Sequence, residues 1–175
     1  MKKVYQRILD PVRGDCFKCA ICSLFGLDYE VVPNFSELYG SGEWFILASK
    51  FFKELGYEYC ADTLWNPNVH FLENPTDCCF NDRSVDPGHT LDAITPEDGI
   101  DGMFIASVYS PGYTSASEHP MSHLHSVLCD INFNIVFDPN PNYQNVLCYP
   151  YSKLIGYNGI RTIDTIRPKT KEDKK

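Results

Sequence analysis

The spacing of apolar residues predicts two helices in the first third of the chain. Over residues 16–25, apolar side chains recur at helical offsets, Asp15 stands at the expected N-cap, and Gly26 is a typical C-terminal stop. The same periodicity predicts a second helix over residues 42–55, which Gly56 ends. Its apolar positions are Trp44, Leu47, Ala48, Phe51, Phe52 and Leu55.

Strand character replaces the helical spacing in the second half of the chain. Residues 103–109, 125–129 and 135–138 are short apolar runs between turn formers, and the last two are predicted to pair as a hairpin around residues 130–134. Because the helices come first and antiparallel strands follow, the sequence predicts an α+β fold. Two further candidates for strands are residues 2–6 and, as a strand or hairpin, residues 149–161.

Between these halves, residues 60–101 are rich in proline, asparagine, aspartate and glycine and have few periodic apolar positions. A structureless loop of that length is unusual inside a compact domain, so we interpret it as a functional insertion or a subdomain cap. We expect it to cover or flank the active site; the alternative is an insertion packed on the far side. The predicted organisation is a single domain over residues 1–168, followed by a charged, mobile tail over residues 169–175.

Composition limits the class and the location of the protein. The 175 residues fit one domain, and a hydrophobic content of 43 % is typical of a folded globular protein. No apolar stretch approaches the roughly 18 residues of a membrane span, and the first residues lack the apolar segment of a signal peptide. With eight cysteines and no export signal, we expect reduced thiols in a cytoplasmic protein that does not bind membranes.

The net charge of −8 bears on the choice of partner. Residues 167–175 carry five basic and two acidic residues, so the body before them has ten basic and twenty-one acidic residues, a net charge of −11. Such a body repels phosphate backbones, and we expect no nucleic-acid partner. A basic peptide, a neutral small molecule or another protein remains possible as a partner, and the oligomeric state is not predicted.

Cys16 is the strongest candidate for chemistry. It opens the first predicted helix, where unpaired N–H groups and the helix dipole favour a thiolate, which is the nucleophilic form of cysteine. The same N–H groups can receive the oxyanion of a tetrahedral intermediate. Asp15 opposes a second negative charge beside it, so a nearby imidazolium is needed. The alternative is a cysteine that packs in the core.

His125, Asp138 and Gln6 are candidates to complete the site. If the hairpin closes around residues 130–134, His125 lies across from Asp138 to within about one residue of register, with Cβ atoms about 5 Å apart. At that distance a carboxylate can orient an imidazole. Gln6 could donate a second hydrogen bond to an oxyanion. Taken singly, each of these residues is more often structural.

The motifs around these residues resemble a known family. Residues 14–27 read GDCFKCAICSLFGL, and VVPNF follows at residues 31–35. With HSVL at residues 125–128 and DPNP at residues 138–141, they are similar to a group of small bacterial and phage proteins with a papain-like cysteine-hydrolase fold, whose pattern is Q…GDCxxAxxASLLGLxxEEVPNF…HAVV…DPHP. The resemblance covers residues 1–56 and 102–145. Residues 60–101 have no counterpart in it, and cysteines stand at two positions where small residues are usual, Cys19 and Cys22.

This resemblance implies a papain-like α+β fold, with the nucleophile helix packed on an antiparallel sheet. It implies that Cys16 is the nucleophile, His125 the base, Asp138 the residue that orients the imidazole, and Gln6 an oxyanion donor. The function expected is that of a cysteine-dependent hydrolase or acyltransferase of the peptidase or amidase type, without metal or cofactor. The alternative is a non-catalytic binding protein on the same fold, such as a phage-encoded inhibitor or ligand sponge.

Metal sites are weaker alternatives. Cys16, Cys19 and Cys22 have the spacing of an iron–sulfur run, but Gly26 stands where a fourth cysteine is expected, so Cys19 and Cys22 more plausibly line the helix near the core. One group of candidate zinc ligands is His119, His123, His125 and Cys129, with Cys148 or a residue of the insertion as a further ligand. Cys78 and Cys79, with His70 and His89, could form a small structural metal site, although their spacing matches no strong motif.

Overall fold

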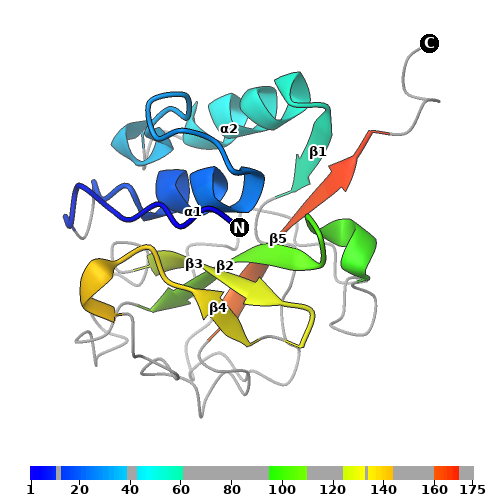
Figure 1. The fold of residues 1–175 in the computed structure, drawn as a ribbon. Coiled ribbons are helices and arrows are strands. Elements are labelled where there is room, and N and C mark those ends of the chain that lie inside the picture. The colour runs from blue at the N-terminus through cyan, green and yellow to red at the C-terminus, as the bar shows by residue number, and fades with distance from the viewer. Residues whose placement is uncertain are drawn as a thin grey trace, which may run out of the picture.

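The structure, a computed structural model, describes residues 1–10, 13–38, 43–60, 95–109, 124–132, 134–143 and 160–169. These residues form an α+β fold in which two helices pack on a five-stranded antiparallel sheet (Figure 1). The fold class predicted from the order of the elements is therefore confirmed. No helix in these ranges is long and apolar enough to cross a lipid bilayer.

Both predicted helices are present. Helix α1 spans Cys16–Phe25, as predicted, and ends at Gly26, whose φ of 68° is left-handed and whose N–H donates to the Cys22 carbonyl. Helix α2 spans Glu43–Glu54, one residue shorter at each end than the prediction. Its buried residues, Trp44, Ala48 and Phe52, recur every four positions, and the expected apolar stripe is narrower because Leu47 is exposed.

The sheet has the strand order β1-β5-β2-β3-β4. Strand β5 joins β1 to the rest of the sheet, because residues 160–164 pair with β2 and residues 165–168 pair with β1. Every pairing is antiparallel. The strands are β1 (Tyr57–Cys60), β2 (Met103–Tyr109), β3 (Leu124–Asp130), β4 (Ile135–Phe137) and β5 (Ile160–Pro168).

Three strands follow the sequence prediction closely: β2 has the predicted bounds, β3 is one residue longer at each end, and β4 ends one residue earlier. The short strand predicted over residues 2–6 is wrong. The N–H groups of this segment have separate acceptors rather than a ladder: Val4 donates to the Ser23 hydroxyl oxygen and Gln6 to the Pro139 carbonyl, each at 2.9 Å. Strand β1 was not predicted, because its four residues are too few to establish a pattern.

Several predictions fall wholly or partly outside the described residues. These include residues 61–94 of the insertion, residues 144–159 of the last predicted strand or hairpin, and residues 170–175 of the tail. The described end of the insertion contains the short 3-10 helix η4 (Pro96–Asp98), and the Asp98 carboxylate pairs with Arg167 of β5. The insertion therefore returns to the sheet at β5. The prediction that it covers the active site stays a prediction.

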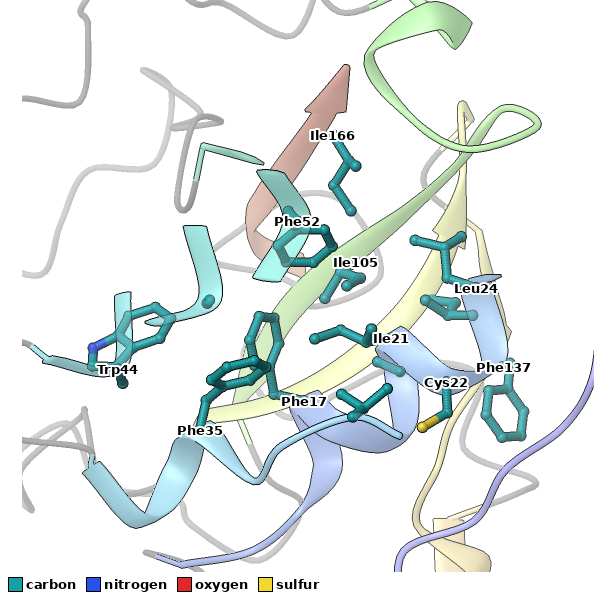
Figure 2. Packing of buried hydrophobic residues seen from close by; sticks show 14 residues of the cluster. Phe17, Ile21, Cys22, Leu24, Phe35, Trp44, Phe52, Ile105, Phe137 and Ile166 are labelled. Atoms are coloured by element: carbon teal, nitrogen blue, oxygen red, sulfur yellow. The ribbon is translucent and has the colours of Figure 1, made fainter. Parts of the chain in front are cut away.

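Two hydrophobic clusters lie on opposite faces of the sheet. Ile105 and Leu128 belong to the cluster beneath the helices (Figure 2), whereas their neighbours along β2 and β3 belong to the second cluster, as alternation in a strand requires. In the first cluster, the Phe17 ring meets the rings of Phe35 and Trp44 edge-on at centroid distances of 5.9 and 6.0 Å. These rings join α1 to Phe35 and to α2. Because α1 also packs on β3 and β2, the place of its first residue is fixed.

Candidate active site

Cys16 is the first residue of α1 and is partly exposed, whereas residues 17–24 behind it are buried. The N–H groups in the first turn of a helix have no acceptor within the helix, and the helix dipole is positive at that end. The thiol thus stands where a negative charge on sulfur is favoured. It is also the residue at which α1 meets the start of strand β3.

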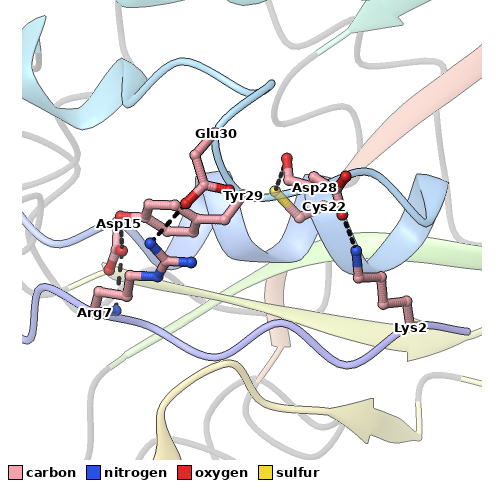
Figure 3. A network of polar contacts seen from close by, with 7 residues as sticks. All are labelled: Lys2, Arg7, Asp15, Cys22, Asp28, Tyr29 and Glu30. Atoms are coloured by element: carbon pink, nitrogen blue, oxygen red, sulfur yellow. Dashed lines mark hydrogen bonds and ion pairs between the residues drawn. The ribbon is translucent and has the colours of Figure 1, made fainter.

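Asp15 does not cap α1 as the sequence predicts. It occupies the N-cap position, but its side chain makes no capping hydrogen bond. The fully buried carboxylate instead accepts hydrogen bonds from the N–H groups of Arg7 and Ile8, each at 3.1 Å, and from the Tyr29 hydroxyl at 2.6 Å (Figure 3). These three donors come from the N-terminal segment and from the loop after α1, so Asp15 joins both segments to the start of the helix.

The Tyr29 ring extends this network. The Arg7 guanidinium lies 3.8 Å from the ring centroid and the Lys18 ammonium 3.7 Å from it. Arg7 also pairs with Glu30 at 2.8 Å. Two cations therefore lie over the ring whose hydroxyl donates to Asp15. The three hydrogen bonds to the Asp15 carboxylate disperse its charge and so reduce the repulsion that Asp15 exerts on an anionic sulfur at the next residue.

His125 and Asp138 are in direct contact. The Nε2 atom of His125 lies 2.6 Å from Oδ1 of Asp138, and both side chains are buried. The predicted register is wrong: Leu128 pairs with Phe137, which places Asp138 across from Val127 when the pairing is extended. The contact is therefore diagonal, which long side chains can span.

A β-bulge between β3 and β4 makes this diagonal contact possible. Cys129 pairs with Ile135, but Leu128 pairs with Phe137, so the register shifts by one residue between the two pairs. Without the bulge, the register of Cys129 and Ile135 would place Asp138 opposite Ser126. The side chains of Ser126 and His125 lie on opposite faces of the sheet, so Asp138 would then face away from the imidazole. The bulge turns the carboxylate to the face of His125, a role that bulges commonly have.

Residues after β4 hold this pair in place. The Asn140 N–H donates to Oδ1 of Asp138 at 2.7 Å, and the 3-10 helix η6 (Pro141–Tyr143) follows directly. The ring of Tyr143 meets the His125 ring edge-on, with 6.0 Å between the centroids. Sequence reasoning missed Tyr143, because nothing in DPNPNY marks the tyrosine as a neighbour of the histidine.

The electrostatics of the site favour an ion pair between Cys16 and His125. Burial by itself raises the pKa of the Cys16 thiol, but hydrogen bonds from His125 and Ser126 and the imidazolium charge outweigh it, and the pKa lies below its ordinary value. Burial likewise opposes the His125 cation, yet hydrogen bonds to Asp138 and Cys16 raise the pKa of His125 to about 9. Sequence reasoning also missed Ser126, although it is next to His125.

Gln6 lies beside the segment that leads into α1. Its backbone N–H donates to the Pro139 carbonyl at 2.9 Å, directly after Asp138, and its Nε2 donates to the Ile8 carbonyl at 3.2 Å. A Cβ atom placed on Gly14 would lie 3.4 Å from this Nε2. The amide is therefore near the backbone two residues before Cys16, and its Oε1 is buried without a hydrogen-bond partner.

The metal alternatives find no support among the described residues. No group of three or more His, Cys, Asp or Glu side chains there could hold a metal ion. Cys16, Cys19 and Cys22 lie along one unbroken helix, with Cys19 and Cys22 in the core as expected. Of the zinc candidates, only His125 and Cys129 lie within the described ranges; His119, His123, Cys148, Cys78, Cys79, His70 and His89 lie outside them.

The chain was compared with models of known protein families, with curated proteins and with solved structures, and none of them matches it. The function therefore has to be inferred from the geometry of the site.

Proposed function

We propose that this chain is a cysteine-dependent hydrolase or acyltransferase that acts on an amide, thioester or related acyl bond through Cys16, His125 and Asp138. The observation that carries the proposal is the buried His125 imidazole, which bonds to the Asp138 carboxylate at 2.6 Å and, against the effect of burial, lowers the pKa of the Cys16 thiol. A thiol with a lowered pKa, a base and a group that orients the base are the parts that nucleophilic catalysis needs.

The proposal includes a papain-like fold, which is more specific than the α+β class, and the positions of these residues support it. The nucleophile begins a helix that packs on β2 and β3, His125 is the second residue of β3, and Asp138 directly follows β4. The family resemblance implies the same layout. In it, the thiol lies at the start of a helix, and the base and the carboxylate lie at the end of an antiparallel sheet on which this helix packs. The peptidase or amidase type of activity rests on the same resemblance.

In the proposed reaction, the Cys16 thiolate attacks the carbonyl carbon and forms a C–S bond, while the carbonyl electron pair moves to oxygen. His125, as imidazolium, gives its proton to the leaving group as the scissile bond breaks and an acyl-enzyme remains. The neutral imidazole then takes a proton from water, and the resulting hydroxide attacks the acyl group. Collapse of this second intermediate releases the acid and restores the thiolate; an amine in place of water gives acyl transfer.

Asp138 and Gln6 have supporting roles in this scheme. Asp138 keeps Nε2 of His125 occupied and stabilises its cation, so the other ring nitrogen, Nδ1, serves the sulfur. The Cys16 N–H at the helix start receives the oxyanion. The Gln6 amide nitrogen donates one hydrogen to Ile8, and its second hydrogen is available for the same oxyanion after a small rotation.

Turnover of an activated acyl ester tests the proposal without knowledge of the natural substrate. With p-nitrophenyl acetate in excess, we expect continuous release of nitrophenolate and a transient acetyl group on Cys16 that mass spectrometry detects. The Cys16→Ala variant should release none above background while it keeps its fold, because the side chain is partly exposed and contributes little packing. A loss of more than about 3 kcal/mol in its free energy of unfolding would instead identify a core cysteine.

The matched control is Cys60→Ala, which removes an exposed thiol at the end of β1. It should keep full turnover. Acetylation of Cys16 that stops after one equivalent would contradict the proposal, because it indicates a reactive thiol without a functional base for deacylation. That result would favour a binding protein on the same fold.

A further inference from the structure

Two cysteines that the proposed reaction does not use lie on the same helix as the nucleophile. Cys19 and Cys22 follow Cys16 at intervals of three residues, and both are fully buried. The family resemblance expects small residues at these two positions, so the thiols need another explanation. Their surroundings differ, and only one of them is suited to react with Cys16.

Helix geometry allows a bond between Cys16 and Cys19. Residues three apart on an α-helix have Cα atoms about 5 Å apart. This falls within the range of roughly 4.4–6.8 Å that disulfides span. The pair occupies the first turn of α1, where the Cys19 N–H bonds to the Asp15 carbonyl at 2.9 Å. Because Cα–Cβ bonds tilt toward the helix N-terminus, the Cys19 side chain is directed toward the turn that holds Cys16.

Asp15 is placed to act as a base for Cys19. Its backbone carbonyl accepts the Cys19 N–H at 2.9 Å, and the charge of its carboxylate acts on the Cys19 thiol. Burial is the largest influence on Cys19 and, together with the Asp15 charge, raises its pKa far above the ordinary value, so it remains a thiol until its proton can pass to Asp15. Cys16 has the opposite character, since it is partly exposed and its pKa is lowered. A partly exposed thiolate beside a buried thiol at a helix start is the arrangement of Cys-x-x-Cys redox pairs.

Cys22 lacks these features. Its Sγ donates to the Asp28 carbonyl, in the loop after α1, at 3.8 Å (Figure 3). It packs in the main hydrophobic cluster, and burial raises the pKa of its thiol to about 11. Cys22 also lies six residues, nearly two helical turns, from Cys16, so its sulfur does not reach the nucleophile. It serves as a matched control for Cys19.

We propose that Cys16 and Cys19 form a reversible dithiol–disulfide pair, in which Cys19 resolves Cys16 after a hydroperoxide has oxidised it. The Cys16 thiolate attacks the terminal oxygen of the hydroperoxide, and the O–O bond breaks. Cys16 becomes a sulfenic acid, and the oxygen that leaves takes a proton from the His125 imidazolium and departs as an alcohol or water. Cys19 passes its proton to Asp15 and attacks the Cys16 sulfur. The S–S bond forms as hydroxide leaves, and hydroxide takes the proton from Asp15 as water. A dithiol reductant reverses the bond.

The disulfide would regulate the nucleophile of the proposed reaction, and this regulatory role rests on the proposed function. Forming it requires Cys16 to rotate about χ1 away from His125, so acyl transfer stops while the bond is in place. The pairing also protects the site, because a sulfenic acid left unresolved oxidises further to sulfinic acid, which most reductants do not reverse. Cys19 is thus a switch and a safeguard for Cys16.

Peptide mapping of the oxidised chain tests the pairing directly. Trypsin cleaves after Arg13 and Lys18, which places Cys16 on the peptide 14–18 and both Cys19 and Cys22 on the peptide 19–50. The chain is treated with one equivalent of hydrogen peroxide, and its free thiols are then blocked. We expect a disulfide to join these two peptides and two thiols to be lost together. Dithiothreitol should restore both thiols. In Cys19→Ala the joined peptides should be lost, and dimedone should trap a sulfenic acid on Cys16 instead.

Cys22→Ala, which removes an equally buried thiol, should give the same joined peptides as the unaltered chain. Three results would overturn the proposal: joined peptides that persist in Cys19→Ala, a Cys19–Cys22 bond within peptide 19–50, or a Cys16 that dimedone labels equally with and without Cys19. Alkylation of Cys16 by iodoacetamide at about pH 6, measured on the same samples, reports the thiolate itself. A chain that keeps this alkylation but forms no disulfide leaves the proposed function intact and removes only the redox pair.

Discussion

The Nε2 atom of His125 lies 2.6 Å from Oδ1 of Asp138, although the strand register places Asp138 across from Val127. The pair meets diagonally because the bulge between β3 and β4 turns the carboxylate to the face of the imidazole. Both side chains are buried, and the hydrogen bond is short, so the carboxylate holds Nε2 of the ring and thereby fixes the orientation of the imidazole. The site thus depends on one irregularity in an otherwise regular hairpin.

Substitutions at the two partners should have unequal effects on turnover. We expect His125→Ala to lower kcat/KM by roughly 10²–10⁴-fold, the usual contribution of a general acid–base group. Asp138→Asn should lower it less, because an asparagine carbonyl can still accept the Nε2 hydrogen and orient the ring. Steady-state kinetics on the acyl ester measure both. Equal losses together with a misfolded Asp138→Asn protein would show that Asp138 is structural.

Gly14 should tolerate no side chain. A Cβ atom there would lie 2.4 Å from the Asp10 carbonyl oxygen and 3.4 Å from Nε2 of Gln6, so Gly14→Ala must displace the backbone that leads into Cys16. We expect a loss of about 1–3 kcal/mol in the free energy of unfolding and a lower kcat for the folded fraction. Urea unfolding and initial rates measure the two effects.

Gly26→Ala is the control for that experiment. Its φ of 68° makes alanine strained, but no atom outside its chain neighbours lies within 4 Å of the added Cβ, and it is at the far end of α1 from Cys16. It should cost about 1–2 kcal/mol of stability and leave kcat unchanged. If Gly14→Ala also loses stability but keeps its kcat, the close approach of Gly14 to the Asp10 carbonyl does not affect the site.

Tyr29→Phe removes one of the donors to the buried Asp15 carboxylate. The lost hydrogen bond, 2.6 Å long, is to a charged group, so we expect the free energy of unfolding to fall by about 1–3 kcal/mol. The ring contacts with Arg7 and Lys18 remain possible in the variant. Chemical denaturation measures the change. An unaltered stability would mean that water or another donor replaces the hydroxyl and that the network is less important than its geometry indicates.

Both helices and the strands β2, β3 and β4 were accessible from sequence because their apolar residues follow a clear pattern, whereas β5 lies almost wholly beyond the strand or hairpin predicted over residues 149–161. Helix α1 has apolar residues at helical offsets and a glycine at its end, and β2 and β3 have regular short apolar runs. Strand β1 was missed because four residues carry too little pattern. The strand expected over residues 2–6 failed because its donors meet a serine side chain and a lone carbonyl, which are tertiary partners that no local pattern reveals.

The candidate site could be assembled from sequence only as far as residue types and order. Cys16, His125 and Asp138 were selected on those grounds, and the structure places the latter two in contact. The bulge was not foreseeable, because nothing in the turn indicates an extra residue in β4. Asp15 was assigned to the helix cap because its position matches one, yet buried donors of the N-terminal segment compete for the carboxylate and prevail.

The pH dependence of Cys16 alkylation tests the central claim most directly. Because the pKa of Cys16 is lowered by His125, its thiolate should persist as the pH falls, and iodoacetamide should label it at about pH 6 in preference to the exposed Cys60. The ratio of Cys16 to Cys60 labelling should rise from about pH 9 to about pH 6, and this rise should disappear in His125→Ala. A Cys16 that follows the pH profile of Cys60 in the unaltered chain, or that keeps its low-pH labelling without His125, would contradict the account.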